Sequence, residues 1–292
     1  MRKAFIIFLT FIGGSIHAQN IPPDRLSDWS QSGAVDSFQF IRTSIYFEDF
    51  ADFSAPDAPQ DSALSRAINF LGDVPVRIIF PEGEFYFEKS IKLRSNLIIE
   101  GAGSKKTILK LDPKDTQNGI EANGRLTDTL YPIRRNISKG DLDLRIPNNH
   151  VLKPGDWVKI SFNDSSLVTS SWALGAVGQL VQIQSVIGNQ VHFKTPIRLD
   201  IPLSLNPTLR LIDPIQNLKF TSVGLEMRNE SWTEGTNFRL SLAVNCIIKE
   251  IESINGNFTH LLLHQSANIS VECSYFHRAF RYGNGGEGYG IT

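Results

Sequence analysis

The sequence predicts an all-β protein built as a solenoid, in which short strands follow one another along a coiled chain. The main observation is the stretch 76–111, VRIIFPEGEFYFEKSIKLRSNLIIEGAGSKKTILKL, whose apolar residues recur at every second position. This period is that of strands, and the runs are too short for ordinary helices. The breaks are turn-forming groups such as Pro-Glu-Gly at 81–83 and Gly-Ala-Gly at 101–103, which leave no room for a helical connection.

A recurring asparagine is the second observation. Asn217, Asn245 and Asn268 each precede an alternating apolar run, with separations of 28 and 23 residues. Such a repeat suits one turn of a three-sided β-helix. We therefore expect these residues at one corner of the coil, stacked as a ladder that satisfies the backbone groups of the turns. The other interpretation is that Asn is simply common in turns.

Composition and charge agree with this fold class. The chain has 292 residues, enough for one large all-β domain or two smaller ones, and its 22 Gly and 19 Phe against two Met favour a turn-rich β protein with an aromatic core. Charged residues make up 20% and the net charge is −1. A balance this close to neutral carries no electrostatic signal for nucleic acid, so we expect no nucleic-acid partner.

The N-terminus has the pattern of an export signal. A basic segment at 1–3 precedes an apolar run at 4–16, and Ile-His-Ala at 16–18 is a suitable cleavage site. We predict that residues 1–18 form a signal peptide and that the mature chain is secreted, periplasmic or at the cell surface. An apolar run of this length is short for a membrane span and no second one follows, so we expect no stable membrane insertion after cleavage.

The mature chain is expected to begin with an irregular segment, 19–58, that lies along the surface. In the next segment, 59–111, a single helix precedes the first coils. Its apolar residues recur at spacings of three and four within 60–71, and Gly72 follows its end. The first coil of a solenoid would otherwise expose its apolar interior, so we expect this helix to cap it.

Beyond Leu111 the short rhythm is lost until about residue 215. Longer alternating runs occur at 142–146, 154–162 and 178–199. Gly188-Asn189 between two such runs favours a hairpin. We therefore predict an inserted antiparallel β subdomain over 112–215 and a return to β-helix coils over 216–292. The last residues, 289–292, have the pattern of a starting strand, so we expect the protein to continue beyond this sequence.

Three segments in order carry a resemblance to a known family. These are QDSALSRAINF at 60–70, VRIIFPEGEFYF at 76–87 and IKLRSNLIIEGAGSKKTILK at 91–110. Together they resemble the start of the pectate-lyase-like right-handed parallel β-helix of the pectate lyase superfamily and polygalacturonase-related proteins. There, a short helix caps the first coil, a strand ending in Pro-x-Gly leads to an aromatic strand, and a strand with a Gly-x-Gly turn follows. The resemblance implies a single-stranded, right-handed parallel β-helix with a capping helix.

Candidate site residues cluster on the last complete coils. The weak catalytic candidates are Glu252, Glu272 and His277, and the candidate substrate-binding residues are Arg278, Arg281 and Tyr282. Acidic polysaccharides need cations to pair with carboxylates and aromatic planes to stack on sugar rings, and Arg with Tyr supplies both. If Glu252 and Glu272 stack on neighbouring coils, they would lie about one strand spacing, ~4.8 Å, apart. The alternative is that these charges merely solvate an outer face.

Other features indicate little chemistry. The segment 283–288 satisfies G-x-G-x-x-G, but no βαβ unit surrounds it, so a loop between coils is the better interpretation. His260 and His264 flank three leucines and are expected as two surface histidines rather than metal ligands. Cys246 and Cys273 could form a disulfide in an oxidising compartment or act as small buried apolar residues, and we favour the latter. No cofactor is indicated by the residues, and only the family resemblance implies that Ca²⁺ can take part.

The sequence therefore predicts an exported carbohydrate-active protein. The leading hypothesis is an enzyme that cleaves an acidic polysaccharide by β-elimination or by hydrolysis, in a groove along the stacked strands beside the inserted subdomain. A lyase needs a base near the C5 proton and a cation at the uronate, whereas a hydrolase needs two carboxyl groups roughly 5–10 Å apart. The alternative is a non-catalytic β-helix that binds glycans or serves as a surface adhesin or scaffold, since this fold carries all of these functions.

Overall fold

The computed structural model describes most of the chain after residue 32. The described ranges are 33–34, 41–52, 58–114, 117–230, 235–282 and 286–292, and all of them belong to one compact unit, Gly33–Thr292. The predicted signal peptide, 1–18, and residues 283–285 of the glycine-rich loop lie outside them. No helix within these ranges is long and apolar enough to cross a membrane.

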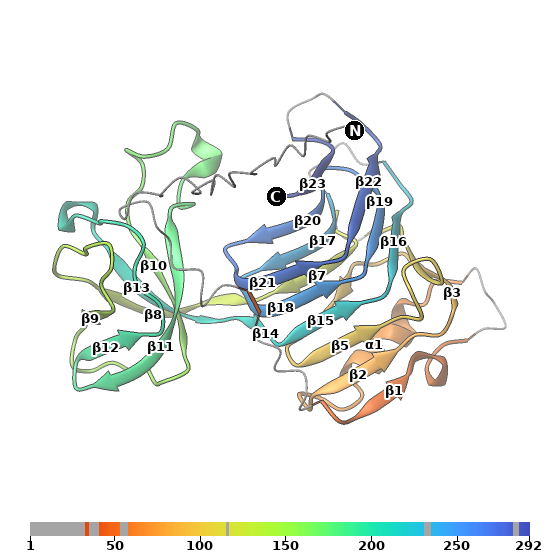
Figure 1. Cartoon of the computed structure of the whole chain (residues 1–292), viewed down its shortest axis with the longest axis horizontal. Coiled ribbons are helices and arrows are strands. Elements are labelled where there is room, and N and C mark those ends of the chain that lie inside the picture. The colour runs from red at the N-terminus through yellow and green to blue at the C-terminus, as the bar shows by residue number, and fades with distance from the viewer. Residues whose placement is uncertain (1–32, 35–40, 53–57, 115–116, 231–234, 283–285) are drawn as a thin grey trace, which may run out of the picture. The chain divides into compact units, whose positions relative to one another are not determined.

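Most described strands form three parallel sheets, named here A, B and C (Figure 1). Sheet A contains β1 (Ser44–Tyr46), β2 (Val76–Ile79), β5 (Leu97–Glu100), β14 (Ile215–Gln216), β15 (Leu218–Thr221), β18 (Ala243–Lys249) and β21 (Ala267–Glu272). Sheet B contains β3 (Gly83–Phe87), β6 (Thr107–Leu111), β16 (Gly224–Met227), β19 (Glu252–Gly256) and β22 (Tyr275–Ala279). Sheet C contains β4 (Ile91–Lys92), β7 (Ile120–Asn123), β17 (Thr236–Ser241), β20 (Thr259–His264) and β23 (Tyr289–Ile291).

The chain passes through sheets A, B and C in turn and then repeats the passage, so each coil contributes one strand to each sheet. The first coil is β2, β3 and β4, and the last described coil is β21, β22 and β23. Strands of successive coils pair in parallel and in register; Phe85, Leu109 and Leu225 are direct neighbours in sheet B. This is the parallel β-helix arrangement that the sequence predicts.

Side chains that point inward form one continuous apolar core. Its largest fully buried members include Phe80, Phe87, Phe220 and Phe238. The helix α1 (Asp61–Asn69) falls within the predicted range of 60–71, and its apolar face, Ala63, Leu64, Ala67 and Ile68, is buried in the same core. Burial of this face, rather than helix propensity alone, stabilises so short a helix.

One corner of the coil is a ladder of asparagines. Asn96, Asn217, Asn245 and Asn268 have φ of 57°, 56°, 53° and 54°, the left-handed region that Asn tolerates better than most residues. The Asn217 side-chain amide donates to Asn96 Oδ1 at 3.0 Å, and that of Asn245 donates to Asn217 Oδ1 at 2.7 Å. The predicted ladder is confirmed for Asn217 and Asn245 and begins one coil earlier, at Asn96, and Asn268 shares the left-handed conformation of this corner.

The inserted subdomain is a separate antiparallel sheet with its own apolar core. Its strands are, in spatial order, β8 (Arg125–Pro132), β13 (Thr208–Asp213), β10 (Trp157–Ser161), β11 (Gly178–Ile187), β12 (Gln190–Phe193) and β9 (Asp143–Arg145). The predicted Gly188-Asn189 turn joins β11 to β12. The insertion begins later than the predicted residue 112, because β7 pairs in parallel with β4 and β17 and so still belongs to the coil.

The segment predicted to be irregular contributes to the fold. Its strand β1 pairs in parallel with β2, and Phe47 is fully buried with its ring stacked 4.2 Å from that of Phe80. On the outer side of sheet A, Ile98 and Ile247 are covered by Ala34 and Ile41. The sequence did not reveal this role because a three-residue strand is too short to show a period.

Replacing a ladder asparagine tests whether the corner limits stability. We expect Asn245→Ala to lower the free energy of unfolding by about 2 kcal/mol, because Ala tolerates the left-handed conformation poorly and the bond to Asn217 is lost. Asn245→Gly should recover the backbone part of this loss. Urea unfolding is the measurement, with exposed Asn148→Ala as the matched control. Equal values for the Ala and Gly variants would contradict a backbone origin.

Candidate functional site

The candidate site lies on the outer face of sheet B, where β19 and β22 are neighbours. Glu252 is paired with Tyr275, and Ile254 with His277. Successive side chains on a strand point to opposite faces. Because Phe276 packs against the apolar core, its neighbours Tyr275 and His277 point away from that core. In-register stacking thus brings together residues that are separated by an entire coil in the sequence.

Glu252 is the centre of this site. It is only 4% exposed although it lies on the outer face. His277 Nε2 donates a hydrogen bond to Glu252 Oε1 at 2.8 Å, and Lys105 Nζ donates to the same oxygen. Lys105 comes from the loop between β5 and β6. In sheet B the strand β16 (Gly224–Met227) lies between β6 and β19, and the insertion adds sequence but no further coil, so Lys105 reaches across β16 to Glu252.

The two donors keep Glu252 ionised. Burial alone would raise the pKa of this carboxyl, but the hydrogen bonds from Lys105 and then His277 outweigh it, and the pKa lies below the ordinary value. A carboxylate can only accept, so His277 Nε2 carries the proton. In the neutral ring this leaves Nδ1 with a free lone pair.

An aromatic surface borders this pair. The ring of Tyr275 stacks on His277 with centroids 4.3 Å apart and an interplanar angle of 13°, and Tyr275 is 61% exposed. The Lys105 side chain is also largely exposed. The site therefore combines an oriented imidazole, a cationic side chain and an accessible aromatic plane. These groups can accept a proton, attract an anionic group and stack on a ring.

The second predicted carboxylate lies elsewhere. Glu272 is at the end of β21 in sheet A, exposed and opposite Lys249. The coil repeats after 23 residues here, so the residue stacked on Glu252 is Tyr275. Glu272 therefore does not stack on Glu252, because the chain turns a corner between Glu272 and β22. Sequence spacing suggested neighbouring coils but did not show on which side of the corner each residue falls.

The three predicted substrate-binding residues follow His277 closely but differ in their surroundings. Arg278 is exposed at φ 61°. Arg281 is bonded to Glu230 and lies 3.9 Å from Glu287, so its charge is compensated. Tyr282 is exposed, and its hydroxyl accepts a hydrogen bond from the Ala279 amide at 2.6 Å. Arg278 and Tyr282 are thus exposed in the stretch of chain that follows His277, whereas the Arg281 charge is paired.

His260 differs from its expected surface position. It is 3% exposed; its Nε2 donates to the Arg278 carbonyl at 2.8 Å, and Nδ1 lies 3.0 Å from Ser253 Oγ. Burial lowers its pKa, which keeps the ring neutral. His260 lies next to the corner between sheets B and C, where residues of β17 and β19 cover it. It supports the backbone of Arg278 and has no access to a ligand.

The structure shows whether the two cysteines form a disulfide and whether possible metal ligands lie close together. Both cysteines are free and form no disulfide. Cys246 is buried as expected, but the expected burial of Cys273 is wrong, because it lies exposed at a corner of the coil. Burial raises the pKa of the Cys246 thiol to about 12, which fits the role of a small core residue. Within the described ranges, no three His, Cys, Asp or Glu side chains are grouped as metal ligands.

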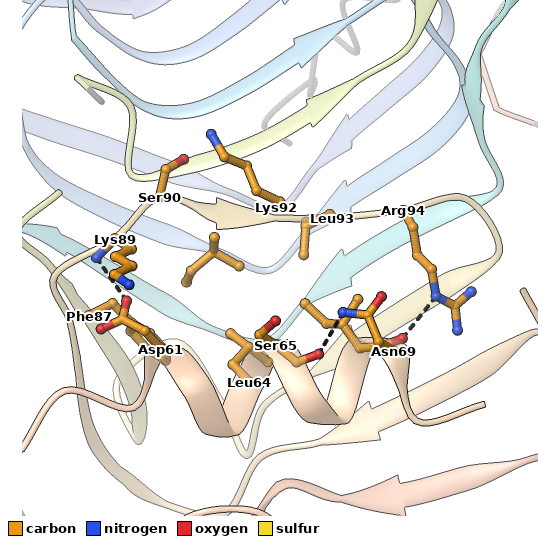
Figure 2. A pocket seen from close by; sticks show the side chains of 12 residues that line it. Asp61, Leu64, Ser65, Asn69, Phe87, Lys89, Ser90, Lys92, Leu93 and Arg94 are labelled. Atoms are coloured by element: carbon orange, nitrogen blue, oxygen red, sulfur yellow. Dashed lines mark hydrogen bonds between the residues drawn. The ribbon is translucent and has the colours of Figure 1, made fainter. Parts of the chain in front are cut away.

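A pocket of 420 Å³ lies elsewhere, between α1 and β4 (Figure 2). Its charged groups serve the fold: Asp61 accepts from the Glu88 and Lys89 amides at 3.2 and 2.8 Å, and Arg94 donates to the Ile68 carbonyl at 2.9 Å. It contains none of the predicted site residues. These bonds fasten the helix to the first coil, so we place the candidate site on sheet B and not here.

The ionised state of Glu252 has a consequence for stability. Its pKa is lower in the folded chain than the ordinary 4.5. The resulting stabilisation is therefore present above that pH and is lost as the pH falls through the lowered value. We expect Glu252→Gln to reduce the free energy of unfolding by about 2 kcal/mol near neutral pH, and by less under acidic conditions.

Urea unfolding across a pH series measures this effect. The matched control is Glu272→Gln, which removes an exposed carboxylate from the end of β21 and should change the stability little at any pH. A loss in Glu252→Gln that is the same at neutral and acidic pH would contradict the assigned ionisation.

Comparisons with known proteins support the fold. No family model matches the chain, and no curated protein matches it. Among solved structures, the tailspike gp61 of Pseudomonas phage phi297 has a TM-score of 0.66 and 14% identity, covering 86% of this chain and 44% of that one. The Gp54 tailspike of Acinetobacter baumannii bacteriophage AP22, in complex with A. baumannii capsular saccharide, has a TM-score of 0.51 and 14% identity, covering 81% and 46%.

These likenesses concern architecture. This chain spans less than half the length of each of the two tailspikes. Identities this low show a shared fold and assign no activity. The resemblance to the pectate lyase superfamily is accordingly supported at the level of the parallel β-helix.

Proposed function

We propose that this protein is an exported, polysaccharide-degrading enzyme with its site at Glu252 and His277. In this proposal the coil is right-handed, α1 caps its first turn, and residues 1–18 direct export. Two observations support a polysaccharide as substrate. The chain shares its fold with a tailspike whose structure holds a capsular saccharide, and the site carries the exposed aromatic plane of Tyr275 beside cationic groups.

β-Elimination fits the site better than hydrolysis, and the hydrogen bond between Glu252 and His277 carries this conclusion. A glycoside hydrolase uses one carboxyl group as a protonated acid and a second as base or nucleophile. Glu252 is instead held ionised by hydrogen bonds from two donors, and its described partners are Lys105 and His277 rather than a second carboxyl. Such a carboxylate suits the orientation of a base rather than the donation of a proton.

In this mechanism His277 Nδ1 takes the C5 proton of a uronate. The C5–H bond breaks, its electrons form the C4–C5 double bond, and the C4–O bond breaks with the leaving oxygen protonated by water. Glu252 fixes the His277 tautomer and stabilises the imidazolium that results. Lys105 and Arg278 supply positive charge for the uronate carboxylate, whose interaction strengthens as charge develops at C5.

A non-catalytic glycan-binding protein is the second candidate. The observation that favours it is that the Glu252 charge is already satisfied by Lys105 and His277, while Tyr275 and Tyr282 expose large ring surfaces. In that case the same face binds a sugar chain, and the Glu252 network only holds the two strands together.

Turnover of acidic polysaccharides separates these candidates. We expect the full chain to release unsaturated uronides from at least one of polygalacturonate, alginate and chondroitin sulfate, detected by ultraviolet absorbance. His277→Ala should lower this rate by about 10²- to 10⁴-fold, as loss of a general base does. His192→Ala, on β12 of the inserted sheet, is the matched control and should retain the rate.

The other outcomes are equally specific. New reducing ends without ultraviolet absorbance would indicate hydrolysis. Binding without any product would favour the non-catalytic candidate. Unchanged turnover in His277→Ala would show that the chemistry takes place at another site.

A further inference from the structure

A group of basic side chains lies away from Glu252, where sheet C meets the inserted sheet. Its members are Lys159 on β10, Arg210 on β13, Arg239 on β17 and His264 on β20, called here the basic cluster. Lys159 and Arg210 are direct partners in the inserted sheet. In sheet C, Phe238 and Leu240 point into the core, so Arg239 points outward, as does His264 opposite Ser241.

Contacts between the two sheets bring these residues together. On the inserted sheet, Trp157 and Ile212 share the face of Lys159 and Arg210 and pack against Leu242 and Val244 of the β-helix. Farther along the same face, Lys159 Nζ donates to Gln265 Oε1 at 2.9 Å. Since Gln265 follows His264, this bond holds the Lys159 ammonium beside the end of β20.

The members of the cluster repel one another. Burial lowers the pKa of Lys159, and Arg210 lowers it further. Burial likewise lowers the pKa of His264, and the charges of Arg239 and Lys159 add to this effect. Lys159 and His264 are thus coupled across the two sheets, while Arg210 is coupled to Lys159 within the inserted sheet and Arg239 to His264 within sheet C. Holding like charges together in a partly buried place costs stability unless an anion is nearby.

Two carboxylates of the protein, Asp164 and Glu121, are electrostatically coupled to the cluster. Within the described residues, Lys159, Arg210 and Arg239 form no ion pair. Asp164 is the carboxylate coupled to Lys159, but its oxygens accept from the Gly175 and Val177 amides at 2.9 and 3.0 Å.

The carboxylate near Arg239 is also engaged. Glu121 accepts hydrogen bonds from Lys92, Asn118 and Asn123 at 2.6, 2.6 and 3.0 Å. The Nε atom of Arg239 is buried without a hydrogen-bond partner, and an unsatisfied buried donor is costly. The cluster therefore retains a buried donor without a hydrogen bond, and the two carboxylates near it are already engaged by other donors.

We propose that the basic cluster binds the carboxylates of a uronate-bearing polysaccharide, at a site separate from Glu252. Guanidinium groups bind carboxylates through paired, charge-assisted hydrogen bonds, and Arg210 and Arg239 supply two such groups. The site retains the polymer and takes no part in the chemistry, because its residues lie on sheet C and the inserted sheet whereas Glu252 lies on sheet B. The choice of a uronate rests on the proposed function.

Binding by the full chain tests this site. The probes are polygalacturonate, alginate and chondroitin sulfate, with dextran as the uncharged comparison, followed by affinity electrophoresis and calorimetry. We expect Arg210→Ala and Arg239→Ala each to weaken binding of a uronate polymer about tenfold, the effect of losing one charge-assisted contact, and the double variant to weaken it further. Added salt should weaken binding by the wild type more than by the double variant.

The matched control is Arg198→Ala, which removes an exposed arginine of the insertion outside the cluster and should leave binding unchanged. Thermal unfolding distinguishes a binding site from a structural cluster. Removing one of several repelling charges should leave the unfolding temperature unchanged or raise it. A marked fall in that temperature for Arg210→Ala would overturn the proposal, as would wild-type affinity in the double variant or failure of the wild type to bind any of the three charged polymers.

The outcome is distinguishable from that of the proposed enzyme. His277→Ala should bind the polymer as the wild type does, even if it forms no product. If the wild type forms no product from any of the polymers, but Arg210→Ala and Arg239→Ala lose binding, the result would support the binding site and reject the enzyme. Turnover that depends on His277, together with binding that is unaffected by Arg210 and Arg239, would support the enzyme and reject the binding site.

Discussion

In-register stacking of parallel coils underlies every other feature of this protein, and the stacking is set by how the chain turns at its corners. At one corner the turn is made by a left-handed residue in each coil, and this residue is Asn from Asn96 to Asn268. A side-chain amide there can bond to the same residue of the next coil, so the strain of the turn is offset by a ladder of hydrogen bonds. Another corner uses Ser222, Glu250 and Cys273 in the same conformation, which shows that the geometry, and not one residue type, is required.

Register then decides which side chains meet. Glu252 and His277 are 25 residues apart but come together because they lie on adjacent strands of one sheet face. Lys105 is 147 residues from Glu252 and reaches the same oxygen because the insertion leaves the coil without breaking its register. A solenoid can thus carry a large insertion between two coils while preserving a site assembled from both sides of it.

The three-sided coil also separates tasks by face. On the outer side of sheet A, Ala34 and Ile41 pack against Ile98 and Ile247. Sheet B carries an oriented carboxylate and imidazole, whereas sheet C contributes Arg239 and His264 to a basic cluster completed by the inserted sheet. An extended polymer can engage residues on more than one face, because a single sugar chain is long compared with the spacing between adjacent coils. The basic cluster can therefore bind the same polymer as Glu252 and His277 although it lies on a different sheet.

The class of fold, the helix at 60–71, the inserted antiparallel segment and the asparagine corner could all be predicted from the sequence, because they depend on local periods and turn chemistry. Glu252 and His277 were also singled out there by residue type. The three-dimensional structure was needed to show that they touch, that Glu272 is on another sheet and that His260 is buried. Lys105, Arg210 and Arg239 were not found from the sequence, since a lone basic residue on a strand has no local signal. Their proposed roles depend on contacts between coils and between the coils and the insertion. Such contacts cannot be predicted from the number of residues that separate two positions in the sequence.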